Sequence, residues 1–470
     1  MSGSRSTTKG IRLGSGERRL LLVVGDVLAA FGGAAVALTL WGNLDYFGPT
    51  LAFVRFRAAW FIILPMLWPL FMVNLYDVHA AGSWRVTVRG VLAAAAGGAV
   101  AYLIVYFLQE GSLARRGILY FLVSTVAFTL VWRAVYIRVF TSPTFLRRVL
   151  VIGAGVGGRA LVSIYQGANP KPFLLLGFID DDVQKKWQAI EGVQVLGSGP
   201  DLARVITETG ATDLIVAIQG PLNSATFQSL LEAQEHGLVV TRLPVAYEEL
   251  LGRVPIQHLE ADWILRSFVD ELHVSGAYLV AKRLVDLGGA LLGLGVLLLI
   301  LPWVALATIV DSGRPVFFRQ KRVGKGGHDF ELAKLRTMRQ DAEKNGIAVW
   351  AHDGDPRTTP VGRILRKAHL DEFPQFWSVL RGDMSLVGPR PERPELVSNL
   401  EKRIPFYRAR LLVKPGITGW AQVNYGKGAS LEGSAEKLEY DLYYIKHRSL
   451  GLDIRIMLRT LGSVIGLKGV

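Results

Sequence analysis

Long apolar runs alternate with polar stretches along this chain, and most of the runs lie in its first third. They are "LLLVVGDVLAAFGGAAVALTLW" over residues 20–41, then Trp60 to Leu75, Val91 to Leu108, and Ile118 to about Val139. About twenty consecutive apolar residues suffice for a helix to cross a bilayer. The first run is also too long for the apolar part of a cleaved secretory signal. The pattern predicts a basic tail over residues 1–19 and four transmembrane helices over residues 20–140.

Basic residues give these helices an orientation. They lie in the tail, after the second run and after the fourth run, at Arg85, Arg89, Arg147 and Arg148. Loops rich in Lys and Arg tend to stay in the cytoplasm. Arginines on the other side weaken the asymmetry, at Arg55, Arg57, Arg115 and Arg116. The balance predicts that both ends of the four-helix segment face the cytoplasm.

A different period begins near Arg147, where short apolar strands alternate with amphipathic stretches. In "RRVLVIGAGVGGRALVSIY" a strand-like run is followed by Gly153, Gly155 and Gly158 in G-x-G-x-x-G spacing. Asp180, Asp181 and Asp182 close the next strand, about where dinucleotide-binding folds carry a ribose-binding acid. The pattern predicts a Rossmann-like domain over residues 147–272. Its glycines either bind a nucleotide or allow the close packing of a tight strand-to-helix turn, and both interpretations stay open.

A fifth apolar run, over residues 281–313, carries Pro302 in its interior. Both of its ends are basic, with Lys282 and Arg283 at its start and Arg314, Arg319, Lys321 and Arg322 after it. Basic flanks place both ends in the cytoplasm, and an internal proline bends or breaks a helix. The run therefore predicts a re-entrant membrane helix that turns at Pro302, with a fifth transmembrane helix as the alternative.

The composition is that expected of a membrane protein whose partners are negatively charged. The 470 residues are 50% hydrophobic, carry a formal net charge of +14 and contain no cysteine, and the mean hydropathy is +0.32. A basic chain suits nucleic acid, anionic lipid or a phosphorylated substrate, and the membrane segments favour the last two. The absence of cysteine excludes disulfides, thiolate nucleophiles and Cys-ligated metals.

Candidate chemistry concentrates in "HLDEFPQFWSVLRGDMSLVGPRPERPE". Adjacent helical residues point about 100° apart, so Asp371 and Glu372 cannot face each other as a carboxylate dyad. The two acids are therefore expected to have different roles. Pro374 and Gly382 predict a short helix that starts at this pair. An ionised Asp can attack phosphorus, while a neighbouring Glu holds Mg²⁺. Several cations could bind a substrate with more than one phosphate, namely Lys334, Arg336, Arg366 and Arg390. The alternative is that the acids merely stabilise a first turn and that "GPRPERP" is a stiff connector.

Five motifs agree in order with one known family. They are "GRPVFFRQKRVGKGGHDFELAKLRTM", "DPRTTPVGRILRKAHLDEFPQ", "GDMSLVGPRPERPE", "KPGITGWAQVNYG" and "YDLYYIKHRS". Over about Ala281 to Val470 the chain resembles the bacterial sugar transferases, the monotopic phosphoglycosyl transferases. The whole layout resembles their large members. The resemblance implies a four-helix transmembrane bundle, a degenerate Rossmann-like, CoA-binding-like domain, and a re-entrant-helix monotopic α+β catalytic domain over residues 314–470.

The resemblance also implies a reaction and roles. Asp371 would attack a UDP-sugar, release UMP and pass the phosphosugar to undecaprenyl phosphate, which starts an exopolysaccharide or O-antigen. Glu372 matches the metal-associated acid, with Asp371 beside it at a Mg²⁺ ion. Arg366 matches a phosphate-binding arginine, and the nucleotide-contacting loop is formed by Gly388, Pro389, Arg390 and Pro391. Pro302 matches the proline that breaks the re-entrant helix.

The implied partners are a UDP-sugar, undecaprenyl phosphate and the anionic lipid of the bacterial inner membrane, with the catalytic domain on the cytoplasmic face. No nucleic acid is expected, and a homodimer and the identity of the sugar stay open. All groups needed for phosphoryl transfer follow residue 330. The middle domain is therefore predicted to be dispensable for chemistry, so that a chain beginning near Ser275 stays active.

Some positions depart from the family pattern. His369 stands where small hydroxyl residues are usual, Leu335 stands where Phe is usual, and "YYIKHRS" lacks the usual Asn-Trp. The last departure bears on the lipid contacts that the resemblance implies near His447 and Arg448, and none of the departures removes a charged catalytic group. Two other functions remain as alternatives: a membrane-anchored nucleotide-sugar dehydratase and a non-enzymatic nucleotide-sensing scaffold. The dehydratase needs a Tyr-x-x-x-Lys base, and no tyrosine lies four residues before Lys446.

Overall fold

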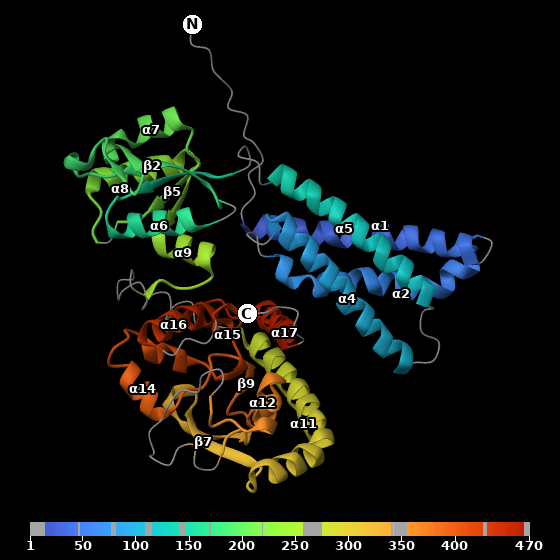
Figure 1. Cartoon of the computed structure of the whole chain (residues 1–470). Helices are drawn as coiled ribbons and strands as arrows, with labels where there is room; N and C mark the ends of the chain where they lie inside the picture. The colour runs from blue at the N-terminus through green and yellow to red at the C-terminus, as the bar shows by residue number, and fades with distance from the viewer. Residues whose placement is uncertain are drawn as a thin grey trace. The chain divides into compact units, whose positions relative to one another are not determined.

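The computed structural model comprises two compact units, Met1–Leu250 and Leu251–Val470 (Figure 1). It describes residues 15–45, 48–76, 81–108, 115–140, 146–168, 171–218, 220–256, 275–339, 342, 355–425 and 430–464. Most of the predicted basic tail and the predicted domain boundary at residue 272 lie outside these ranges.

Four long helices occupy the predicted membrane runs. They are α1 (Ser15–Asp45), α2 (Leu51–Phe71), α4 (Trp84–Leu108) and α5 (Arg115–Phe140), with the short turn η1 (Val73–Tyr76) after α2. Three of them, α1, α4 and α5, are long and apolar enough to cross a membrane. Within α2, the segment Ala59–Phe71 forms a shorter apolar helix.

A buried ion pair joins the first and last helices of this bundle. Arg133 of α5 places Nη2 2.6 Å from Oδ2 of Asp26 on α1, and neither side chain is exposed. The same guanidinium donates to the carbonyl of Leu75, 2.9 Å away. Charges in an apolar interior are tolerated when they are paired and hydrogen-bonded, so this contact fixes how α1 and α5 lie against each other.

The middle of the chain forms the predicted Rossmann-like domain. Its sheet has the order β3-β4-β2-β1-β5-β6 and is parallel except for β3. The strands are β1 (Arg148–Ile152), β2 (Leu174–Ile179), β3 (Ala189–Ile190), β4 (Val193–Gly197), β5 (Asp213–Val216) and β6 (Val239–Arg242). Helices α6 (Val156–Gly167) and α9 (Leu243–Leu251) cover one face, and α7 (Leu202–Thr209) and α8 (Ser224–Glu235) cover the other (Figure 1).

The second unit combines short helices with two small sheets around one core. The sheets are the antiparallel hairpin β7 (Phe317–Val323) and β8 (Asp329–Leu335), and the parallel pair β9 (Ser385–Val387) and β10 (Gly416–Thr418). The helices are α12 (Pro360–Lys367), α13 (Gln375–Arg381), α14 (Pro394–Leu400), α15 (Trp420–Asn424), α16 (Leu431–Lys446) and α17 (Leu450–Val464), with the 3₁₀ turns η6 (Lys325–Gly327), η7 (Leu370–Glu372) and η8 (Tyr407–Leu412). The core joins α13, β9, η8 and α16.

One helix of this unit is far longer than the others. Helix α11 (Gly276–Ser312) has 37 residues and contains Pro302, and a straight helix of that length extends about 55 Å. Both of its ends bind the same unit, because Lys282 pairs with Asp453 at 3.0 Å and the Asp311 carboxylate accepts from Val361 N at 3.3 Å. The ribbon runs along one side of the unit and changes direction toward its C-terminal end (Figure 1).

Large apolar side chains cover the outer surface of α11. Leu292, Leu299, Trp303 and Val310 are each at least three-quarters exposed, from 75% for Trp303 to 81% for Val310. Exposed apolar surface of this extent is expected where lipid replaces water. The helix is therefore attached to the unit at both ends while its outer face is suited to hydrocarbon.

The second unit begins before α11. Val254 and Ile256 are buried in its core, Val254 N donates to the carbonyl of Glu439 at 3.0 Å, and Ile256 N donates to the Glu439 carboxylate at 3.2 Å. The indole of Trp420 donates to the carbonyl of Gly252 at 2.7 Å. Residues 252–256, here called the arm, thus belong to this unit, whereas the sequence pattern placed them in the middle domain.

Candidate active site

Glu372 lies between two cations that come from different elements. Lys334 on β8 places Nζ 2.8 Å from Glu372 Oε1, and Arg390 places Nη2 2.6 Å from the same oxygen. The lysine and the carboxylate are mostly buried, while 46% of the Arg390 side chain is exposed. The structure therefore brings three of the predicted site residues, Lys334, Glu372 and Arg390, together in one polar cluster.

These contacts lower the pKa of the Glu372 carboxyl. Burial alone would raise the pKa of its carboxyl, but Arg390 and Lys334 together outweigh burial and hold that pKa below its usual range. Burial lowers the pKa of Lys334, while the neighbouring Glu372 opposes that change. The carboxylate of Glu372 therefore stays ionised at neutral pH, compensated by the cations on either side.

Asp371 has a different environment from its neighbour. Burial and the negative charge of Glu372 raise the pKa of Asp371, against the opposing charges of Lys334 and Arg366. Within the described part of the chain, its carboxylate forms no ion pair or hydrogen bond, so it has no competing partner there. The two adjacent acids therefore have different environments, because Glu372 is paired with Lys334 and Arg390 whereas Asp371 has no such partner among the described residues.

The acid pair precedes the helix instead of starting it. Both residues lie in the 3₁₀ turn η7, Pro374 occupies the cap position, and α13 begins only at Gln375. His369, just before η7, has φ of 55°, a left-handed conformation that is uncommon outside glycine and that redirects the chain into the turn. The compensation of Glu372 therefore comes from Lys334 and Arg390, where the sequence pattern had indicated a helix N-terminus.

Two further predicted cations lie apart from Glu372. Arg366, in the last turn of α12, donates from Nε to Thr337 Oγ1 at 2.8 Å and from Nη1 to Thr358 Oγ1 at 3.2 Å, and its charge acts on Asp371. Arg336 is only 6% exposed. Its Nη2 donates to the carbonyl of Ser312 at 3.0 Å and to that of Gly313, at the C-terminal end of α11.

The loop that carries Arg390 is held from several directions. Gly388 lies so close to Lys414 that a Cβ there would be 2.3 Å from its carbonyl oxygen, which explains the glycine. Four consecutive carbonyls accept hydrogen bonds: that of Pro389 from Gly416 N, that of Arg390 from Arg410, that of Pro391 from Arg322 and that of Glu392 from Val323 N, at 2.9–3.1 Å. The loop is a rigid platform for one exposed guanidinium.

The sequence pattern does not indicate that Arg322 and Arg410 hold this loop. Each uses its guanidinium to hold a loop carbonyl and also faces a nearby acid, Glu392 for Arg322 at 3.9 Å and Asp441 for Arg410 at 2.9 Å. The available signal was a set of basic residues next to apolar ones, in "FFRQKRV" and "FYRARLL". Such positions are common, and their distance from residue 390 along the chain hides the contact.

The donors for a metal ion are few. Among the described residues no three or more His, Asp or Glu side chains form a group that could hold a metal, so Asp371 and Glu372 are two carboxylates without a third. Mg²⁺ is often bound by one or two carboxylates together with substrate phosphates. The pair therefore fits an ion that shares its ligands with a diphosphate, not one held by the protein alone.

The glycine turn of the middle domain is explained largely by packing. Gly153 has φ of 101°, and a Cβ on Gly158 would lie 2.1 Å from the Gly153 carbonyl oxygen, whereas one on Gly155 would meet nothing within 4 Å. The Asp180 carboxylate accepts from Ala154 N in this turn at 2.7 Å. The turn thus already binds an internal carboxylate, and Gly155 alone has no packing reason to be glycine.

Comparisons with known proteins find similarity in both the N-terminal and the C-terminal half of the chain. A family profile described as "Bacterial sugar transferase" matches residues 277–466, and one described as "CoA-binding domain" matches residues 72–242. The UDP-glucose:undecaprenyl-phosphate glucose-1-phosphate transferase of Xanthomonas campestris pv. campestris is 31% identical over 448 residues, which cover 90% of this chain and 89% of that protein.

Two other relatives show how far the similarity extends. The undecaprenyl-phosphate glucose phosphotransferase of Komagataeibacter xylinus is 30% identical over 83% of this chain and 73% of that protein. The UDP-N-acetylgalactosamine-undecaprenyl-phosphate N-acetylgalactosaminephosphotransferase of Aeromonas hydrophila is 42% identical over 46% of this chain and 50% of that protein, so this match spans half of that relative.

This chain belongs to the bacterial sugar transferase family, which confirms the resemblance drawn from its motifs. Its apolar helices make it a membrane protein. Its relatives are named as transferases of sugar phosphates to undecaprenyl phosphate, and the names differ in the sugar.

Proposed function

We propose that this protein transfers a hexose-1-phosphate from a UDP-sugar to undecaprenyl phosphate and releases UMP. The observation that carries the proposal is the contrast between the two acids. Glu372 is held by Lys334 and Arg390, while the adjacent Asp371 has no ion pair among the described residues. The names of the relatives support the general reaction.

The proposed first step forms a bond between Asp371 and phosphorus. A carboxylate oxygen attacks the phosphorus next to the sugar, the bond from that phosphorus to the bridging oxygen breaks, and UMP leaves with that oxygen. The product is an acyl phosphate that joins the sugar phosphate to Asp371. A carboxylate is a competent nucleophile for phosphoryl groups, and no proton needs to be removed from it once it is ionised.

In the proposed second step, an oxygen of undecaprenyl phosphate attacks the same phosphorus. The acyl phosphate bond breaks, Asp371 is restored as a carboxylate, and the product is an undecaprenyl diphosphate sugar. This product would be the first lipid-linked unit of an exopolysaccharide or O-antigen.

The cations are placed to stabilise charge during both steps. Arg390 is partly exposed on a held loop, Lys334 lies on the other side of Glu372, and Arg366 acts on Asp371 from α12. Preorganised cations stabilise charge that develops on phosphate oxygens without reorganising during the reaction. Asp371 and Glu372 would also hold a Mg²⁺ ion, which when bound neutralises negative charge on the diphosphate.

The arrangement of α11 supports a re-entrant position at the cytoplasmic face of the inner membrane. Both ends of the helix bind one unit, and its exposed face is apolar. In this proposal, a helix attached in this way would bring the site to the membrane surface, where a water-soluble sugar nucleotide and a membrane lipid can meet. Basic residues on both flanks agree with a cytoplasmic side for both ends.

The test supplies the full chain, purified in lipid, with undecaprenyl phosphate, Mg²⁺ and one UDP-sugar at a time. The panel contains UDP-glucose, UDP-galactose and their N-acetylated counterparts, and UMP release is measured. UMP release that depends on one of these sugars supports the proposal and identifies the sugar. Failure of every donor, with a folded and membrane-bound protein, would exclude this function for these substrates.

A further inference from the structure

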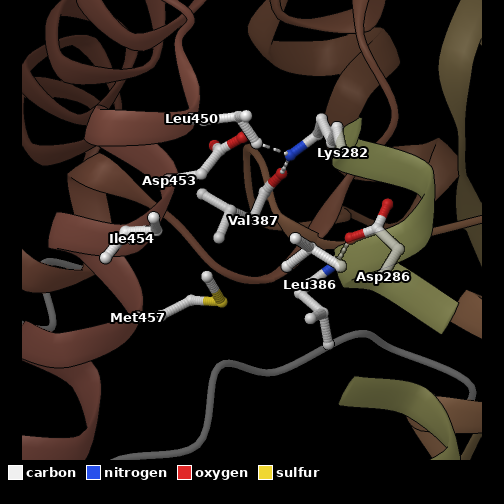
Figure 2. A pocket seen from close by; sticks show the side chains of 9 residues that line it. Lys282, Asp286, Leu386, Val387, Leu450, Asp453, Ile454 and Met457 are labelled. Atoms are coloured by element: carbon white, nitrogen blue, oxygen red, sulfur yellow. Dashed lines mark hydrogen bonds and ion pairs between the residues drawn. The ribbon is translucent and has the colours of Figure 1, made fainter. Parts of the chain in front are cut away.

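The first turns of α11 contact the strand that leads into the Arg390 loop. Lys282 extends from α11 into a small pocket between α11, β9 and α17, where Leu450, Ile454 and Met457 form the apolar wall (Figure 2). Its ammonium donates to the carbonyl of Val387 at 3.1 Å, to Tyr444 Oη at 3.2 Å and to Asp453 Oδ2 at 3.0 Å. An ammonium has three N–H groups, so each of them has one acceptor.

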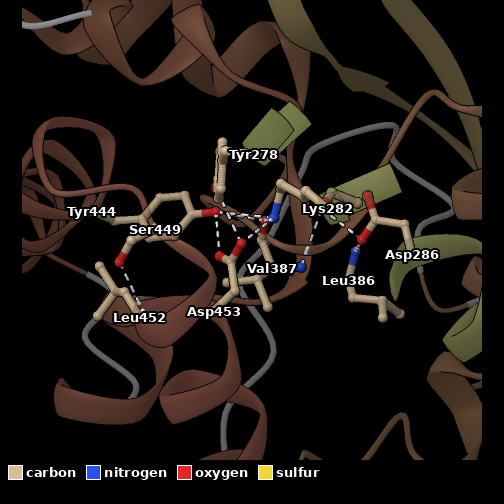
Figure 3. A network of polar contacts seen from close by, with 10 residues as sticks. Tyr278, Lys282, Asp286, Leu386, Val387, Tyr444, Ser449, Leu452 and Asp453 are labelled. Atoms are coloured by element: carbon tan, nitrogen blue, oxygen red, sulfur yellow. Dashed lines mark hydrogen bonds and ion pairs between the residues drawn. The ribbon is translucent and has the colours of Figure 1, made fainter. Parts of the chain in front are cut away.

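The other members of this network are also satisfied. Asp453 is 2% exposed, and its carboxylate accepts from Tyr444 at 2.8 Å and from Tyr278 at 3.0 Å in addition to Lys282 (Figure 3). Burial raises the pKa of Tyr444, so its hydroxyl keeps the proton that it donates. A buried network in which every donor has an acceptor defines one geometry, and here that geometry includes the Val387 carbonyl.

Asp286 holds the other end of the same strand. It lies one turn beyond Lys282 on α11, is buried, and accepts from Ser385 Oγ and from Leu386 N, each at 2.9 Å (Figure 3). A Cβ on Gly289, further along the helix, would lie 2.5 Å from a Leu386 methyl carbon. Side chain and backbone contacts together therefore fix β9 against α11.

This attachment bears on the position of Arg390. Strand β9 has three residues and pairs only with β10 among the described strands, and two short strands are marginal without further packing. Val387 directly precedes Gly388, and Arg390 lies two residues after Gly388. Arg390 Nη2 is 2.6 Å from Glu372 Oε1. A shift of β9 would therefore move the guanidinium relative to Glu372.

We propose that Lys282 and Asp286 are positioning residues, which hold β9 through Val387 and Leu386 and thereby set where Arg390 lies relative to the donor's diphosphate. The proposal rests on the proposed function, because it assigns the diphosphate to Arg390. Neither side chain touches the reacting atoms. The same membrane helix that anchors the unit thus also fixes one wall of its active site.

The test uses the full chain in lipid and compares Lys282→Met, Asp286→Ala and Asp286→Asn with the parent. Asn keeps an oxygen that accepts from Ser385 and Leu386, while Ala removes it. Arg319→Gln removes an exposed charge from β7 and serves as the control. Initial rates of UMP release are measured as the UDP-sugar and undecaprenyl phosphate are varied in turn.

We expect Lys282→Met and Asp286→Ala to raise the KM for the UDP-sugar, and thereby to lower kcat/KM for it, by between about 10-fold and 100-fold, with the KM for the lipid unchanged. Asp286→Asn should recover most of the loss, and Arg319→Gln should behave like the parent. A loss of folded protein alone would lower the maximal rate with both KM values unchanged, which would overturn the proposal.

A second comparison introduces Lys282→Met and Asp286→Ala, each separately, into a chain that already carries Arg390→Ala. If Lys282 acts through Arg390, Lys282→Met should have little further effect on kcat/KM there, because the group that it positions is absent. Full additivity of the two changes would contradict the proposal.

Hydrogen exchange separates this proposal from the proposed function. In Lys282→Met and Asp286→Ala, amides of residues 385–391 should exchange faster than in the parent, while those of α16 should not. If the parent releases no UMP with any donor but this exchange pattern is found, the function is wrong and the attachment of β9 is supported. Unchanged exchange at residues 385–391 would overturn the attachment whatever the activity.

Discussion

Arg390 Nη2 lies 2.6 Å from Oε1 of Glu372, a residue 18 positions earlier in the chain. The contact joins the turn that carries the acid pair to the loop that carries Arg390, with α13 and β9 between them. Because Lys334 meets the same oxygen at 2.8 Å, the Glu372 carboxylate is the centre of the candidate site.

Replacement of Arg390 should mainly affect the nucleotide sugar. Arg390→Ala should lower kcat/KM for the UDP-sugar by about 100-fold or more, because it removes a preorganised cation from the diphosphate. Arg390→Lys should recover only part of the loss, since Lys keeps the charge but not the planar fork. Steady-state kinetics with each substrate varied would show this, and an unchanged kcat/KM in Arg390→Ala would contradict the role of the loop.

The activity should fall at low pH with a midpoint above the usual range for Asp. Asp371 must be ionised to attack, and its pKa is raised by burial and by Glu372, so protonation begins at a higher pH than for an exposed Asp near about 3.9. Lys334 opposes this shift, so Lys334→Met should move the acidic limb to higher pH. The measurement is kcat/KM for the UDP-sugar between pH 4 and pH 9, about the range over which these groups titrate. An acidic limb that stays in place in Lys334→Met would argue against Asp371 as its origin.

The arm should be needed for the stability of the catalytic unit. A chain that begins at Leu251 keeps Val254 and Ile256, whereas one that begins at Ser275 loses them and leaves the Glu439 carboxylate without its Ile256 contact. Burial of each apolar side chain contributes about 1.5–3 kcal/mol, so the shorter chain should unfold at least about 5 °C lower.

Thermal unfolding of both chains in the same detergent measures this difference, with UMP release as a second readout. The sequence alone predicts that a chain beginning near Ser275 remains active, whereas the packing of the arm predicts reduced stability for it. Equal midpoints for the two chains would mean that the arm contributes nothing to the unit.

The two ends of α11 should lie on the same side of the membrane. The chain has no cysteine, so single cysteines can be introduced by Leu279→Cys and Arg314→Cys and treated with a membrane-impermeant maleimide in oriented vesicles. Both should react only from the cytoplasmic side. Arg116→Cys, in the first turn of α5 and predicted to face the other side, is the matched control. Reaction of Arg314→Cys from the outside would show that α11 spans the bilayer.

The sequence predicts those features that depend on neighbouring residues. Apolar runs indicated α1, α4, α5 and α11, and the spacing of Gly153 and Gly158 indicated a strand, a tight turn and a helix. The two glycines are required by the backbone itself, one by its positive φ and the other by the approach of the Gly153 carbonyl. Patterns of this kind are local, so they can be recognised without a structure.

The features that were not predicted depend on contacts between distant parts of the chain. Lys282 reaches Val387 across 105 positions, and Lys334 reaches Glu372 across 38. The arm was also missed, because two buried residues around one proline have no helical or strand period. The pairing of Glu372 with Lys334 and Arg390 shows why an acid at a turn needs the tertiary structure to be interpreted.

A single-turnover measurement without undecaprenyl phosphate tests the proposed covalent step on Asp371 most directly. With the UDP-sugar identified by the panel and labelled in its sugar, the parent chain should release up to one UMP per active site. It should also retain the labelled sugar phosphate on the peptide that contains Asp371. Asp371→Asn should show neither, with a loss of turnover on the order of 1,000-fold or more. UMP release by the parent that requires the lipid and leaves no label, or substantial turnover by Asp371→Asn, would contradict a covalent intermediate on Asp371.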